Sequence, residues 1–107
     1  MINDLKSKIE AWKSEYGKLY KTIVEGDEYI WRKLKRKEYV EVMNILQQEG
    51  EDEDSVVYKR QAAIVQKTCL YPEKIDDELE KSAGLAITLS DEIIAKSGFG
   101  QAETQEL

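Results

Sequence analysis

Histidine is absent from this 107-residue chain, and cysteine and proline each occur once. Without histidine, the chain lacks the commonest general base and the commonest metal ligand of proteins. The single cysteine, Cys69, excludes an internal disulfide and favours folding in the cytoplasm. No apolar run approaches the roughly 20 residues that cross a bilayer, and the N-terminus lacks the apolar run of a signal peptide. We therefore expect a cytoplasmic protein with no membrane segment.

Charged residues make up 36% of the chain and hydrophobic residues 41%, which predicts one soluble domain with a modest core. The net charge of −6 argues against a general nucleic-acid binder. The charge is also uneven, because residues 1–40 carry a net +3 and residues 41–107 a net −9. Such polarity can orient a partner protein or a neighbouring copy, so a homo-oligomer is one open option.

Apolar residues recur at helical spacing in four segments, each of which ends near a glycine or a proline. Pro72 cannot continue the third of these helices. The acidic stretch that follows, residues 73–82, is either a short helix or a loop. The predicted helices span residues 2–16, 36–48, 55–70 and 84–97. The side chains predicted to be buried on their apolar faces are Trp12, Tyr39, Leu46, Val65 and Leu89.

A β-hairpin is predicted between the first two helices. Residues 19–24 and 29–34 are rich in aromatic and β-branched side chains, and Gly26-Asp27 supplies the turn between them. The fold class is therefore α+β, with about four helices and one hairpin after the first helix. We expect a single domain over residues 1–100 and a polar tail over residues 101–107.

No cluster of reactive side chains matches a catalytic or metal-binding motif. The acids at 51–54 lack the alternate spacing and central glycine of an EF-hand loop, and an acidic first turn of a helix explains them better. Nothing in the sequence places the acids at 76–80 in a cleft, so we expect them on a solvated surface. Cys69 lies on the apolar stripe of its helix, where a buried structural cysteine is expected. We therefore predict no enzymatic activity, no cofactor and no metal.

Basic and aromatic residues are interleaved where the hairpin leads into the second helix. Such interleaving can hold single-stranded nucleic acid, but the run is short and the chain is acidic, so no nucleic-acid partner is expected. Two interpretations stay open: a face with solvated lysines, or an interface with another protein, since Trp, Tyr and Arg are enriched at binding hot spots. In the second, the contact residues are Tyr29, Trp31, Arg32 and Arg36, on a strand with at least one free edge. The alternative is that Trp31 packs on helix 2–16 as core.

A recognisable order of short motifs covers roughly residues 18–99. It consists of the hairpin with Tyr-Ile-Trp-Arg-Lys-Leu at 29–34, Lys-Glu-Tyr at 37–39, an acidic break, Cys-Leu-Tyr-Pro at 69–72, Ala-Gly-Leu at 83–85 and Ser-Gly-Phe at 97–99. This order resembles the tail assembly chaperones of long-tailed bacteriophages and related baseplate-hub assembly proteins. One departure is Lys35-Arg36, which stands where such proteins often have a Ser, Thr or Asn cap.

The resemblance implies a non-enzymatic binding protein of the infected bacterial cytoplasm. Members of that family coat the apolar, helical tape measure protein while the tail tube polymerises around it, and then leave. The implied partner is the tape measure protein or a neighbouring tail or baseplate subunit. The alternative is a structural baseplate or tail subunit that is retained in the virion.

Overall fold

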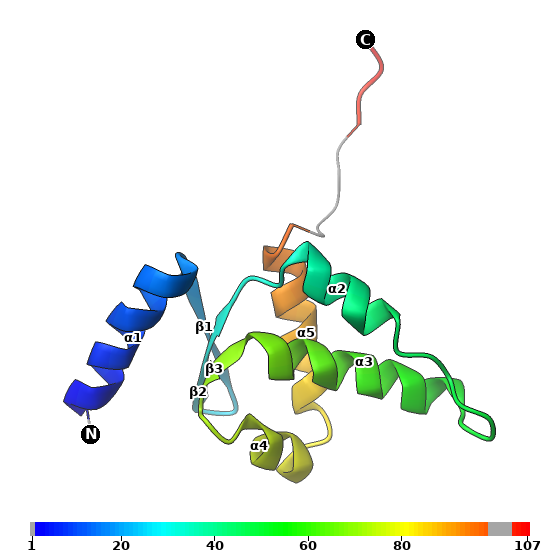
Figure 1. The fold of residues 1–107 in the computed structure, drawn as a ribbon, viewed down its shortest axis with the longest axis horizontal. Coiled ribbons are helices and arrows are strands. Elements are labelled where there is room, and N and C mark those ends of the chain that lie inside the picture. The colour runs from blue at the N-terminus through cyan, green and yellow to red at the C-terminus, as the bar shows by residue number, and fades with distance from the viewer. Residues whose placement is uncertain (1, 99–103) are drawn as a thin grey trace.

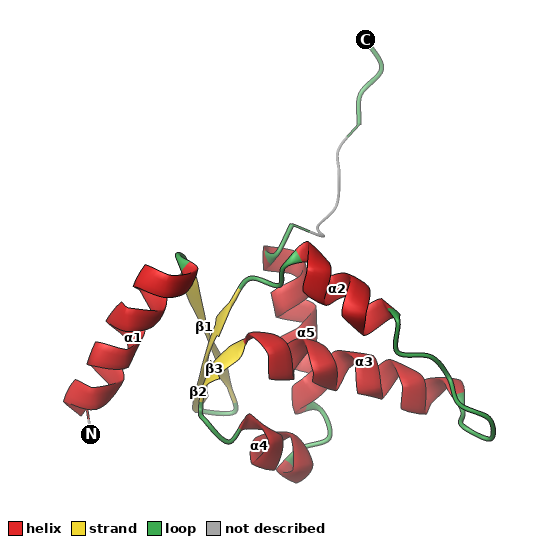
Figure 2. Ribbon diagram, viewed as in Figure 1, coloured by secondary structure: helices red, strands yellow, loops and turns green. Residues whose placement is uncertain are grey.

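The computed structural model describes residues 2–98 and 104–107, within which five helices surround a three-stranded antiparallel sheet (Figures 1 and 2). The elements in chain order are α1 (Ile2–Tyr16), β1 (Leu19–Val24), β2 (Asp27–Arg32), α2 (Arg36–Met43), α3 (Glu53–Thr68), β3 (Cys69–Tyr71), α4 (Ile75–Lys81) and α5 (Leu85–Lys96). The predicted α+β class is confirmed, and so is the hairpin after the first helix.

The hairpin turn lies one residue earlier than predicted. β1 pairs with β2 from Leu19 opposite Arg32 to Val24 opposite Asp27, which leaves Glu25 and Gly26 as the two turn residues. Both have a positive φ, 51° and 86°, as a two-residue type I′ turn requires. Glycine adopts this conformation without strain, whereas Glu25 is an uncommon residue for it.

A third strand, absent from the sequence-based prediction, follows α3. The helix stops at Thr68 rather than at residue 70, and the chain then pairs with β2, Tyr71 opposite Ile30 and Cys69 opposite Trp31. Pro72 favours an extended conformation at the residue before it, which suits a strand. β2 is thus the central strand, so the predicted free edge of this strand is wrong.

The sheet separates two layers: α2 to α5 pack together on one side, and α1 lies on the other (Figures 1 and 2). Tyr29 and Trp31 project from β2 toward the larger group of helices. Trp31 stacks on Tyr20 with ring centroids 4.7 Å apart, and its Nε1 donates to Thr22 Oγ1 at 2.9 Å. The main core cluster consists of Tyr29, Trp31, Leu34, Val42, Ile64, Val65, Ile75, Leu79, Leu85, Ala86, Leu89 and Ile93.

The five core predictions have mixed outcomes. Val65 and Leu89 are fully buried as predicted, while Trp12 and Tyr39 are half-buried. Leu46 is 71% exposed, so its predicted burial is wrong. The reason is that α2 ends at Met43, five residues earlier than predicted, and Leu46 lies in the connection to α3.

Arg60 holds that connection in place. The Arg60 guanidinium donates to the backbone carbonyl of Ile45 twice, from Nε at 3.0 Å and from Nη2 at 2.8 Å. Because the carbonyl of Ile45 accepts these bonds from Arg60 in α3, the non-helical segment after α2 is held against α3. Periodicity along residues 36–48 contains no sign of this long-range contact.

The C-terminal part follows the prediction closely. The acidic stretch after Pro72 forms the short helix α4, which buries Ile75 and Leu79. Gly98 has a φ of 96°, as a glycine that terminates a helix requires. A trailing hydrophobic contact after such a glycine is also expected from the sequence, but Phe99, which would make it, lies outside the described residues. Of the predicted tail over residues 101–107, residues 104–107 are exposed and have no secondary structure, and the rest lies outside the described residues.

Candidate protein-interaction site

The four residues predicted to contact a partner do not form one surface. Tyr29 is 3% exposed and Trp31 is 1% exposed, because β2 is the central strand and helices cover the face on which both lie. Trp31 is therefore core, as the alternative prediction had it, although it packs with the large helical layer rather than with α1. Arg32 is largely buried, and only Arg36 presents an exposed side chain. A partner contact at the hairpin stays a prediction. In the described structure, the buried side chains of Tyr29 and Trp31 are not exposed to a partner.

Arg32 binds elements from three parts of the chain. Its two terminal nitrogens donate to the two carboxylate oxygens of Glu38 in α2, at 2.8 and 2.7 Å. Nη2 also donates to the carbonyl of Lys67 in the last turn of α3, at 2.7 Å. A cation at this end of a helix is favoured by the helix dipole. The guanidinium further lies 5.1 Å from the ring centre of Tyr16 at the end of α1.

Glu38 completes this arrangement. One of its oxygens accepts from the backbone N–H of Lys35 at 3.0 Å, in the manner of a capping box. The hydrogen bonds from Arg32 are the largest influence on this carboxyl group and lower its pKa. Arg32 and Glu38 thus tie β2, α2 and α3 together. Their role in the described structure is to hold these elements rather than to present a binding surface.

α1 is the least embedded helix. Its apolar stripe consists of Leu5, Ile9, Trp12 and Tyr16, and each of these side chains keeps part of its surface exposed. The helix ends at Gly17, whose φ of 81° reverses the chain into β1. None of the described side chains of α1 belongs to the main core cluster. The stripe is therefore formed as predicted but only partly covered.

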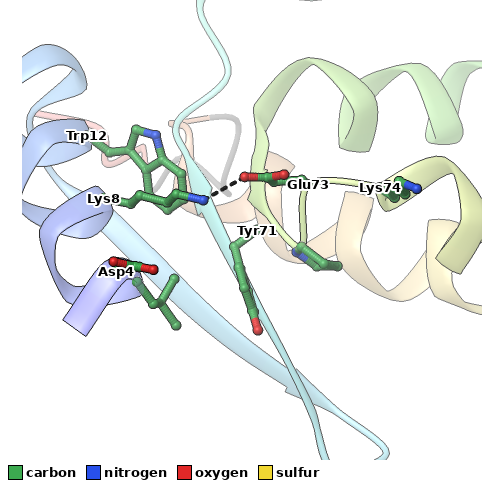
Figure 3. A pocket seen from close by; sticks show the side chains of 8 residues that line it. Asp4, Lys8, Trp12, Tyr71, Glu73 and Lys74 are labelled. Carbon is green, nitrogen blue, oxygen red and sulfur yellow. Dashed lines mark hydrogen bonds and ion pairs between the residues drawn. The ribbon is translucent and has the colours of Figure 1, made fainter. Parts of the chain in front are cut away.

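A groove lies between α1 and the segment that joins β3 to α4. Its volume is about 670 Å³, and Figure 3 shows the side chains that enclose it. Trp12 projects from α1 toward Tyr71 on the opposite wall, and Lys8 Nζ spans the groove to Glu73 Oε1 at 2.6 Å. The hydrogen bond from Lys8 lowers the pKa of Glu73. The full lining is Asp4, Leu5, Lys8, Trp12, Tyr71, Pro72, Glu73 and Lys74.

The sequence indicates the two segments that line this groove, but it does not indicate that they lie next to each other. The stripe of α1 and the Cys-Leu-Tyr-Pro motif were each recognised, but they are about 60 positions apart. Nothing in either segment indicates the other. The two segments come together because β3 pairs with β2, which places Tyr71 on the α1 side of the sheet.

Several of the exposed apolar side chains lie near the connection between α2 and α3 in the sequence. They are Val40, Met43, Leu46, Val57 and Tyr58. Single exposed apolar residues are normal on protein surfaces. The acids of residues 49–54 lie between the two halves of this set in the sequence.

The described residues also show how the reactive groups are placed. They contain no group of three or more His, Cys, Asp or Glu side chains arranged to hold a metal ion. Burial raises the pKa of the Cys69 thiol to about 11, and Sγ donates to the carbonyl of Tyr71 at 3.2 Å, so the thiol is protonated at neutral pH. None of the helices in residues 2–98 combines the length and apolar character that crossing a bilayer requires.

Comparison with protein-family models, curated proteins and solved structures finds no match to this chain.

Proposed function

We propose that the protein is a non-enzymatic tail assembly chaperone of a long-tailed bacteriophage, acting in the host cytoplasm. Its partner is the tape measure protein, whose apolar helices it covers during tail assembly. The observation that carries the proposal is the groove between α1 and the β3–α4 segment, together with the motif order that resembles such chaperones.

The groove has the chemistry that an apolar helix needs. Leu5, Trp12, Tyr71 and Pro72 supply apolar contact area, and aromatic side chains are common anchors in protein interfaces. An amphipathic helix binds such a groove through side chains three and four positions apart. Lys8 and Glu73, whose ion pair bridges the two walls, are both exposed, so a partner helix that enters separates them and can pair with their charges, which sets orientation more than affinity.

The way in which α1 is attached also suits this role. The helix joins the body through Gly17, and outside the groove it contacts mainly β1. A helix held mainly at one end can shift to admit partner helices of different side-chain size. This tolerance suits a chaperone that covers many different turns of one long helical protein.

The test is co-expression of the chain with the tape measure protein of the same phage. We expect the tape measure protein to be insoluble alone and soluble with the wild-type chain. Leu5→Asp with Trp12→Asp should abolish this effect, because charges in the groove oppose an apolar helix. The matched control, Ala11→Asp with Ser14→Asp, adds the same two carboxylates at exposed positions on the same helix and should preserve it. A groove variant that folds and still solubilises the partner would contradict the proposal.

The alternative is a structural tail or baseplate subunit. The two functions differ in whether the protein is present in the completed virion. A chaperone leaves before the particle is complete, whereas a structural subunit remains at a fixed copy number. Quantitative mass spectrometry of purified virions separates the two. Absence from the particles supports the chaperone, and a stoichiometric amount supports the structural subunit.

A further inference from the structure

Basic side chains gather at one end of α2. Lys18, Lys33 and Lys35 line a small cavity of about 180 Å³, together with Tyr16 and the already paired Arg32. Arg36 and Lys37 follow directly in the first turn of α2. Among the described residues, Lys18, Lys33, Lys35, Arg36 and Lys37 have no acidic partner within 4 Å. This set of five is called the basic end below, and none of its members forms an ion pair within 4 Å in the described fold.

Acidic side chains gather beyond the other end of α2. Five of the six residues from 49 to 54 are Asp or Glu. Two of them have local roles: Glu51 pairs with Lys59, and Asp52 accepts from the backbone N–H of Ser55 at the start of α3. Glu49, Glu53 and Asp54 are exposed and, within the described part of the chain, have no basic partner. Residues 49–54 are called the acidic end below.

The two ends do not neutralise each other in one molecule. α2 separates them, with the basic end at its start and the acidic end beyond its last residue, at the far side of the connection to α3 (Figure 1). The eight residues of α2 alone span about 12 Å. That distance already exceeds the screening length of about 10 Å at an ionic strength of 0.1 M. Each molecule therefore carries two opposite, separated surfaces.

We propose that these surfaces join copies of the chain head to tail, with the acidic end of one copy bound to the basic end of the next. Leu46 and Val57, which flank the acidic end in the sequence, have exposed side chains that provide apolar contact area beside its charges. On the basic side, the exposed ring of Tyr16 faces the same cavity as the lysines. The two surfaces are thus complementary in both charge and apolar content.

A second copy is the occupant that these observations favour. Every molecule carries both a basic and an acidic end. When a copy binds through its acidic end to the basic end of another copy, its own basic end stays free to bind a third copy. Because the two contacting surfaces differ, the interface is heterologous and produces rings or open chains rather than closed two-fold dimers. An unrelated acidic protein would use the basic end alone and would leave the acidic end without a role.

The experiment uses the purified full-length chain in sedimentation velocity, across a dilution series at low and high salt. We expect the average mass to rise with protein concentration at low salt and to fall to the monomer at high salt. Two charge-reversal variants test the surfaces. The basic-end variant is Lys33→Glu with Lys35→Glu, and the acidic-end variant is Glu53→Lys with Asp54→Lys. Each alone should associate at least roughly tenfold more weakly, because the charge of the altered end falls from +5 to +1 or from −5 to −1.

The decisive sample is the mixture of the two variants. The basic-end variant keeps an unaltered acidic end, and the acidic-end variant keeps an unaltered basic end. A molecule of one variant can therefore join a molecule of the other through an interface that has no substitution. The mixture should therefore recover association. The control, Lys6→Glu with Lys13→Glu, makes the same change in net charge as the basic-end variant, at exposed positions of α1, and should associate like the wild type. A wild-type chain that stays monomeric at low salt, or a mixture that stays monomeric, overturns the proposal.

This test needs no tape measure protein, so its outcome is independent of the proposed chaperone function. Circular dichroism confirms that each variant is folded, which is expected because the four altered positions are exposed. If the wild type is monomeric but the basic end captures an acidic protein, the basic end serves a different partner and self-association is excluded.

Discussion

α1 and α5 have similar sequence patterns and very different surroundings. Each has apolar residues at spacings of three or four, which predicts one buried face. In α5 that face is fully enclosed, and Leu89 and Ile93 have no exposed surface. In α1 the corresponding Leu5 and Trp12 remain half-exposed beside an open groove. Periodicity therefore indicates which face of a helix is apolar, but not whether this chain or another one covers it.

The largest expected effect tests the enclosed side of this comparison. Leu89→Ala should lower the free energy of unfolding by about 3–5 kcal/mol, because it leaves a cavity between α5 and α3. Denaturant unfolding followed by circular dichroism measures the loss. Ile87→Ala is the control, since Ile87 lies on the same helix but is 46% exposed, and it should cost less than 1 kcal/mol. Similar losses for the two variants would mean that the core does not close around α5 as described.

The next effect concerns Arg32, which joins the helical layer to the end of α1. Arg32→Met should destabilise the fold by about 3 kcal/mol, because the carboxylate of Glu38 then loses its partner in a mostly buried position. Glu38→Gln tests the same contact through pH. The pKa of Glu38 is lower in the folded chain than its ordinary value of 4.5, so the unfolded chain binds the proton more tightly. The ionised carboxylate therefore stabilises the fold above pH 4.5, and this contribution is lost as the pH falls through the lower, folded pKa.

Urea unfolding at a series of pH values measures that contribution. The wild type should lose stability below pH 4.5 more steeply than Glu38→Gln, which has no proton to bind at this position. Parallel pH profiles for the two proteins would mean that Arg32 and Glu38 are not coupled in solution.

A smaller effect is expected in α1. Trp12→Ala should cost about 1–2 kcal/mol, well below the usual loss for an enclosed tryptophan, because its ring borders an open groove. Hydrogen exchange should also show faster opening of α1 than of α5. A loss equal to that of Leu89→Ala would show that α1 is as firmly packed as α5, and the contrast between the two helices would be wrong.

The smallest effect is expected at Leu46. Leu46→Ala should change the free energy of unfolding by no more than about 0.5 kcal/mol, since the side chain is 71% exposed. The same denaturant experiment measures it. A larger loss would place Leu46 in a core that the described contacts do not contain.

Much of the fold follows from local signals. Apolar spacing with a glycine stop predicts α1 and α5, and two segments rich in aromatic and β-branched residues on either side of Gly26 predict the hairpin. The three residues of β3 are too few to show any period, and they follow a helical pattern directly. The early end of α2 was missed for another reason: Leu46 continues the helical spacing, and the Arg60 contact that directs the chain elsewhere is not local.

The candidate site was harder to predict because interface and core use the same residue types. Tyr29 and Trp31 have the composition of a binding hot spot, and they also have the composition of a central strand. Their assignment depends on the partner strand β3, which lies about 40 positions away. Arg32 was recognised as special, but its role depends on Glu38 and on the end of α3. The groove could not be predicted either, because its two walls come from segments about 60 positions apart in the sequence.

The position of β2 between a near and a distant strand has a consequence for the order of folding. β1 reaches β2 through a two-residue turn, whereas Ile30 meets Tyr71 only after the intervening α2 and α3 have shortened the path between them. Closing that long loop costs chain entropy before any contact compensates it. We therefore expect the hairpin to form first and to act as the template on which β3 is added. Pulsed hydrogen-exchange labelling during refolding should show protection in β1 and β2 before β3, and simultaneous protection of all three strands would contradict this order.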